Sequence, residues 1–94
     1  MKFIWDEKKR LSNLKKHGID FADAKTVFDG VTVTFLDEKE DYGEPRQITL
    51  GILSEVAVVV VVHVDSENVI RVISIRKATK GEKRIYYEKI SDQI

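Results

Sequence analysis

The spacing of hydrophobic positions changes near residue 30 and divides the chain into two kinds of structure. Before this point the apolar residues recur three or four positions apart, which predicts helices. Asp6 is a good N-cap for a first helix that runs to about His17 and ends at Gly18. A short strand over residues 3–5 precedes it, and a second, shorter helix with one buried face lies within residues 20–30.

After residue 30 the chain contains runs rich in β-branched residues, which favour strands. Four strands are predicted: Thr32–Leu36, Arg46–Leu53, Val56–Val64 and Val69–Arg76. The joints between the last three are too short for crossover helices, so an antiparallel meander is expected. Val56–Val62 is apolar at every position, which predicts a central strand covered on both faces. The polar, acidic segment Asp37–Pro45 is expected to be an exposed, mobile loop.

The end of the chain has the signature of a last helix. Thr79 and Glu82 have the spacing of a capping box, and the helix extends through Ile90. The predicted order is therefore β-α-α-β-β-β-β-α. This is an α+β fold with an antiparallel meander sheet, two N-terminal helices and a C-terminal helix. At 94 residues, the whole chain 1–94 is expected to be one domain.

Composition excludes several classes of protein. The chain has no cysteine, which rules out disulfides, thiolate chemistry and the commonest zinc sites. The two histidines lie far apart in sequence and no carboxylates have ligand spacing, so neither a metal nor a cofactor is expected. Near the N-terminus a run of only three apolar residues precedes the charged Asp6, so no signal peptide is expected. The longest apolar run has seven residues, which is too short for a membrane span. We expect a cytoplasmic protein.

Charge is segregated along the chain although the net charge is zero. Six basic residues and one acidic residue, Glu82, lie between Arg71 and Arg84, while the segment Asp37–Glu44 contains five acids. Such runs are either solvated faces or, for the basic one, a surface that binds nucleic acid. The charge pattern alone does not choose between these two interpretations.

The order of particular residues along the chain narrows the choice. The first third contains Trp5-Asp6-Glu7, Asn13, Lys16-His17-Gly18, Phe21, Ala24 and Val27-Phe28-Asp29, and the rest contains Gly43-Glu44, Arg46, Gly51, Arg71–Thr79, Glu82 and Tyr86. This set resembles the BrnT family of type II toxins over nearly the whole chain, although Pro45 and Gln47 depart from it. The resemblance implies a RelE-like fold, ribonuclease activity without a metal, and a BrnA-type antitoxin that binds DNA.

RNA cleavage without a metal requires proton transfer from a 2′-hydroxyl and cations that stabilise a pentavalent phosphate. Arg76, at the end of a strand, is the predicted phosphate clamp, and the alternative is an arginine paired with an exposed carboxylate. His63 is the predicted acid/base group, and the alternative is a half-buried histidine with backbone hydrogen bonds. His17 is interpreted as structural because it lies at a helix C-terminus.

Other residues near the basic run complete the predicted site. Glu82 and Tyr86 lie one helical turn apart and can present a carboxylate and a phenol together, although Tyr86 also suits core packing. The predicted RNA-binding cations are Arg46, Arg71, Lys77, Lys80 and Lys83. Period-two alternation along the last strand puts Arg71 and Arg76 on opposite faces.

Two functions follow from this sequence. The first is an endoribonuclease toxin that cleaves mRNA, inhibits translation and growth, and forms a hetero-oligomer with its antitoxin. The second is a catalytically inactive module of the same fold that acts with its antitoxin as a transcriptional co-repressor. The set of Arg46, Arg71, Arg76, Glu82 and Tyr86 favours the first, and the zero net charge favours the second.

Overall fold

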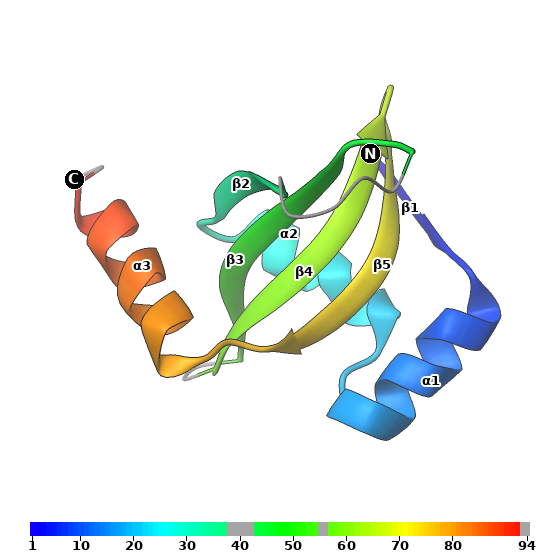
Figure 1. Cartoon of the computed structure of the whole chain (residues 1–94), viewed down its shortest axis with the longest axis horizontal. Coiled ribbons are helices and arrows are strands. Elements are labelled where there is room, and N and C mark those ends of the chain that lie inside the picture. Colours follow the sequence, from blue (N-terminus) through cyan, green and yellow to red (C-terminus); the bar gives the residue numbers. More distant parts are fainter. Residues whose placement is uncertain (38–42, 55–56, 93–94) are drawn as a thin grey trace.

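The fold combines one five-stranded sheet with helices on both of its faces (Figure 1). The computed structural model describes residues 1–37, 43–54 and 57–92. Its elements in chain order are β1 (Lys2–Trp5), α1 (Glu7–His17), the 3-10 helix η1 (Phe21–Asp23), α2 (Ala24–Asp29), β2 (Val33–Asp37), β3 (Arg46–Ser54), β4 (Ala57–Ser66), β5 (Val69–Lys77) and α3 (Lys80–Ser91).

The helix ends follow the predicted capping residues. The Asp6 carboxylate accepts hydrogen bonds from the first turn of α1. Gly18 ends that helix in the left-handed conformation, with φ of 72°, and its N–H donates to the Leu14 carbonyl at 2.8 Å. Thr79 and Glu82 form both bonds of a capping box at the start of α3. The predicted bounds of the first and last helices are therefore confirmed.

The sheet differs from the predicted one in its first strand. Its order is β1-β5-β4-β3-β2, and β2 to β5 form the predicted antiparallel meander with β4 at the centre. β1, however, pairs with β5 in parallel, so the sheet is mixed and the prediction of a purely antiparallel sheet was wrong. The element order also contains η1, which the predicted order lacked. A parallel pair needs a long connection, and here residues 6–68 provide it.

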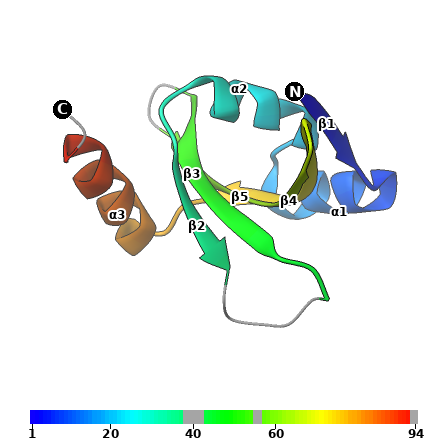
Figure 2. The same cartoon turned by 90° about the horizontal axis from the view of Figure 1, so that it is seen from above.

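Each face of the sheet has its own hydrophobic core. The first lies under α2 and η1, and it includes Phe21, Val27 and Ile75. The second lies under α3, where Tyr86 packs against Leu50, Val60 and other residues of the central strands. Figure 2 shows α2 on one side of the sheet, with α3 displaced to one end of the other side. α3 therefore leaves part of its face uncovered.

Gly51 on β3 lies at the closest approach between the sheet and α2. A Cβ at this position would lie 2.6 Å from Cγ1 of Val27 and 3.5 Å from the Val27 carbonyl oxygen. Only a residue without a side chain allows this approach, because such a contact is shorter than van der Waals packing permits.

Some sequence predictions fall outside the described residues. The predicted acidic loop includes residues 38–42, and the turn before β4 includes residues 55–56. In the described part of the chain, no helix has both the length and the hydropathy that a bilayer span requires.

Candidate functional site

A β-bulge in β5 decides which side chains share a face. Ser74 pairs with Val62 of β4, but Val72 pairs with His63, so Ile73 is an extra residue in β5. Arg71 then pairs with Val64 and Arg76 with Val60. Because residues of β4 two apart point to the same side, Arg71, Ser74 and Arg76 lie on one face. The prediction of opposite faces was wrong, because it assumed regular alternation.

α3 leaves part of this face of the sheet uncovered. We call the uncovered part the open face and define it by Val62 and Val64 of β4 and by Arg71, Ser74 and Arg76 of β5. All five side chains are half-buried. The face is the one that α3 partly covers, since Val60 beside Arg76 belongs to the core under α3. Arg71 and Arg76 are about 13 Å apart along the strand. They can therefore contact different groups of an extended ligand.

Arg76 is held by Glu82 from the first turn of α3. Nη1 and Nη2 donate to the two carboxylate oxygens at 2.7 and 2.9 Å, and Nη1 also donates to the Lys77 carbonyl at 3.3 Å. The hydrogen bonds from Arg76 lower the pKa of Glu82 to about 2, against the opposing effect of its burial. The same pair raises the pKa of Arg76. Glu82 is thus a permanent carboxylate that orients the guanidinium and is too weak a base to accept a proton at neutral pH.

The ion pair leaves part of the guanidinium available. Arginine has five N–H donors, and the bonds to Glu82 and Lys77 engage three of them. The remaining two, Nε–H and the second Nη2–H, lie along the same edge of the planar group. That edge matches two oxygens of a phosphate, and 38% of the side chain is exposed. Arg76 can therefore hold Glu82 and a phosphodiester together.

The other two predicted arginines lie towards the opposite end of the open face. Arg71 forms an ion pair with Glu44, the last acid of the segment Asp37–Glu44. Arg46 begins β3 opposite Asp37 and lies two residues before Ile48, which pairs with Val62 of the open face. The positive charge at this end is therefore accompanied by a carboxylate.

His63 lies on the other face of the sheet. Its ring is 1% exposed and packs edge-on against Phe28 with the centroids 5.0 Å apart. Nε2 is 2.7 Å from the Thr49 hydroxyl, and Nδ1 is 2.5 Å from an Asp65 carboxylate oxygen. The Thr49 hydroxyl is in turn 2.8 Å from that of Thr34. Both ring nitrogens are thus engaged, and the sheet separates His63 from Arg76.

Tyr86 belongs to the core under α3. Its ring is 1% exposed, and its hydroxyl donates to the Val31 carbonyl at 2.8 Å. Burial raises the pKa of this phenol. Tyr86 therefore joins α3 to the segment between α2 and β2. Its phenol points into the core, so it does not lie beside the Glu82 carboxylate at the surface.

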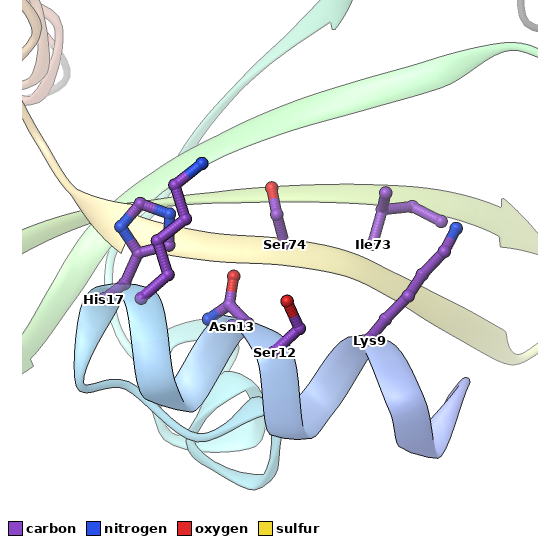
Figure 3. Close-up of a pocket in the computed structure, with 7 residues that line it drawn as sticks. Lys9, Ser12, Asn13, His17, Ile73 and Ser74 are labelled. Atoms are coloured by element: carbon purple, nitrogen blue, oxygen red, sulfur yellow. The ribbon is translucent and has the colours of Figure 1, made fainter.

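Two basic hollows lie on either side of the end of β5. The first has a volume of about 220 Å³ and lies between α1 and β5; it is lined by Lys9, Ser12, Asn13, Lys16, His17, Ile73 and Ser74 (Figure 3). The second, of about 210 Å³, lies where β5 leads into α3 and is lined by Ala57, Val58, Lys77, Ala78 and Lys83. The predicted cations Lys77 and Lys83 thus share a hollow, while Lys80 is exposed in the first turn of α3.

Comparison with known proteins decides the family. Residues 5–82 match the model of a family described as "Ribonuclease toxin, BrnT, of type II toxin-antitoxin system". This match includes all three polar residues of the open face and Glu82. The chain belongs to the BrnT family. The family consists of ribonuclease toxins of type II toxin-antitoxin systems, so this chain is a toxin with an RNA substrate and an antitoxin partner.

The fold agrees with this assignment. The ribonuclease toxin BrnT of Brucella abortus has a similar crystal structure, with a TM-score of 0.63 and 29% sequence identity. The alignment covers 85% of this chain and 99% of the Brucella chain. No curated protein matches this chain in sequence at a significant level.

In this BrnT-family chain, one group of residues beside the open face was not predicted from the sequence. Lys9, Ser12 and Lys16 line the first hollow beside Ser74, and none of them was among the predicted site residues. Their spacing of three, four and seven positions was a visible signal, because it puts them on one face of α1.

Proposed function

We propose that this chain is a metal-independent endoribonuclease that cleaves mRNA, inhibits translation and growth, and is neutralised by a BrnA-type antitoxin in a hetero-oligomer. Residues 1–94 act as one cytoplasmic toxin domain. The observation that carries the proposal is the alignment of Arg71, Ser74 and Arg76 on the open face by the bulge at Ile73. Arg76, with two donors on its uncovered edge, is the group that meets the scissile phosphate.

The residues of the open face act on the phosphate. In cleavage, the 2′-oxygen attacks the adjacent phosphorus and the bond from phosphorus to the 5′-oxygen breaks. Water takes the 2′-hydroxyl proton and returns one to the 5′-oxygen, giving a 2′,3′-cyclic phosphate and a 5′-hydroxyl. Arg76 stabilises the charge that develops on the phosphoryl oxygens, and Glu82 holds its guanidinium in position. His63 and Tyr86, which the sequence suggested as catalysts, maintain the fold.

Substitution of Arg76 tests this function. The purified chain is incubated with single-stranded RNA in EDTA, and the ends of the products are identified. We expect Arg76→Ala to lower the cleavage rate by about 10²- to 10³-fold, as loss of one transition-state donor typically does. Arg76→Lys keeps the charge but lacks the two-donor edge, so its cleavage rate should lie between those of the wild type and Arg76→Ala. Arg84→Ala is the matched control, since Arg84 is exposed on α3 away from the open face.

These measurements can contradict the proposal in two ways. Cleavage that stops in EDTA contradicts metal independence. Equal rates for Arg76→Ala and Arg84→Ala, with folding verified by urea denaturation, contradict the role of Arg76. Growth arrest without the antitoxin and recovery on its co-expression provide the cellular test.

The inactive module is the second candidate, and the ion pairs favour it. Both arginines of the open face contact carboxylates, Arg71 with Glu44 and Arg76 with Glu82. A chain of this kind would be harmless when expressed alone and would bind its operator only in complex with the antitoxin. Growth arrest that Arg76→Ala abolishes excludes this candidate.

A further inference from the structure

The hollow between α1 and β5, which we call the α1 hollow, has the chemistry of an anion site. Lys9, Ser12, Asn13 and Lys16 follow one another at helical spacing, and Ser74 contributes a hydroxyl from β5. Figure 3 shows Lys9, Ser12 and Ser74 pointing in the same general direction from the two elements. Lys9 and Lys16 are about 10 Å apart along the helix axis, so they bracket the hollow.

The cations of this helix divide into two groups. Arg10 turns away from the hollow and bonds to Glu7 and to Asp20, the latter at 3.0 Å. Lys9 and Lys16 form no ion pair within the described parts of the chain, and none of the residues that line the hollow is acidic. By contrast, both arginines of the open face contact carboxylates. The α1 hollow thus offers positive charge without an internal counterion.

Asn13 fixes the floor of the hollow through three hydrogen bonds to the backbone. Its amide Nδ2 donates to the carbonyls of Ile19 and Ile75 at 3.0 and 2.8 Å, and its Oδ1 accepts the N–H of Ile75 at 3.2 Å. These bonds also occupy the edge of β5, so a peptide cannot add to this edge as a further strand. Among the described residues, Ile73 is the only apolar one that lines the hollow, which leaves little to anchor an apolar segment.

Ser74 joins the hollow to the open face. It lies two residues before Arg76 on the same face, about 7 Å away along the strand, a distance that one extended nucleotide can bridge. We propose that the α1 hollow binds a backbone phosphate of the RNA strand next to the scissile one. Lys9 and Lys16 supply the charge, and the Ser12 and Ser74 hydroxyls donate hydrogen bonds. This inference rests on the proposed ribonuclease function.

A salt titration with paired variants tests the α1 hollow. The probe is a 2′-O-methyl RNA oligonucleotide, which cannot be cleaved, and the full chain is compared with Lys9→Gln/Lys16→Gln. The matched control is Lys8→Gln/Lys15→Gln, which removes the same charge at the same spacing from residues that do not line the hollow. Loss of the single phosphate contact should lower the slope of log affinity against log salt by about 0.7. Affinity then falls about 5-fold at about 0.1 M salt.

Cleavage kinetics provide a second readout. The hollow binds a phosphate that does not react, so the Lys9/Lys16 variant should raise KM and leave kcat unchanged. A salt slope and a KM equal to those of the control, in a chain whose wild type cleaves RNA, overturn the α1 hollow and leave the ribonuclease function intact. Normal RNA binding with loss of antitoxin binding also overturns it, in favour of an acidic protein segment. A wild type that neither binds nor cleaves RNA contradicts the ribonuclease function itself.

Discussion

Asn13 is the side chain whose loss should most weaken the attachment of α1 to the sheet. It is 7% exposed and forms three hydrogen bonds with the backbone of Ile19 and Ile75. In Asn13→Ala, two carbonyls and one N–H in a buried region lose their partners. Each such group costs about 1–3 kcal/mol, and partial access of water at the sheet edge lowers the total to about 3–4 kcal/mol.

This loss is large for a chain of 94 residues, whose total stability is expected to be about 5–14 kcal/mol. The midpoint of thermal unfolding should fall by roughly 15 to 30 °C. Urea denaturation at neutral pH measures the free energy of unfolding, and the m-value verifies that the unfolded state is unchanged. Lys15→Ala is the control because Lys15 is exposed on the same helix, and it should change stability by less than about 0.5 kcal/mol.

Asn13→Asp separates the hydrogen bonds from the size of the side chain. The carboxylate still accepts the N–H of Ile75, but it faces the carbonyls of Ile19 and Ile75 without a proton to donate. We expect it to destabilise at least as much as Asn13→Ala at pH 7, and less at acidic pH, where a protonated carboxyl can donate one bond. An Asp variant as stable as the wild type at pH 7, or an Ala variant within about 1 kcal/mol of it, would refute this reasoning.

Further predictions concern packing and pH. Gly51→Ala should lower the free energy of unfolding by about 1–3 kcal/mol because the new methyl overlaps Val27. The Cβ of Gly81→Ala has no neighbour closer than 4.0 Å, so this variant should be more stable by up to about 1 kcal/mol. Urea denaturation measures both. Equal effects of Gly51→Ala and Gly81→Ala on stability would contradict the close approach of β3 to α2. Because its pKa is about 2 in the folded chain, Glu82 stabilises the fold above its ordinary pKa of 4.5, and this contribution is lost as pH falls from 4.5 towards 2. Because the pair of Glu82 with Arg76 is partly exposed, the unfolding free energy lost in this pH range is about 1 kcal/mol. The unfolding free energy of Glu82→Gln, measured in urea at the same pH values, should not show this loss.

The elements of the fold could be predicted because local signals mark them. Asp6, Gly18 and the Thr79–Glu82 box fixed the helix ends, and the all-valine run of β4 fixed the central strand. The parallel pairing of β1 with β5 could not be predicted in the same way. It joins residues far apart in the sequence, such as Lys2 and Val69, and no connecting turn or repeat indicates it.

Regular alternation of side chains along a strand does not predict on which face of the sheet the candidate site residues lie. Val72 and Ile73 form an apolar pair between polar positions of opposite parity, and this break in the pattern was the signal for the bulge. For His63 no comparable signal existed. A strand that is apolar on both sides has no outer face by which to orient its last residues, so the face of His63 depended on where α2 packs.

The bulge and Asn13 together explain why α1 can serve both the fold and a ligand. β1 pairs with β5 only as far as Val72, so the edge of β5 beyond the bulge has no strand partner, and such edges promote aggregation. Asn13 closes this edge with its amide, which brings the lysine-bearing face of α1 beside Ser74. Loss of the Asn13 amide should therefore weaken folding and RNA binding together. Loss of the Lys9 and Lys16 charges should weaken binding alone, because those side chains contribute no bond to the sheet.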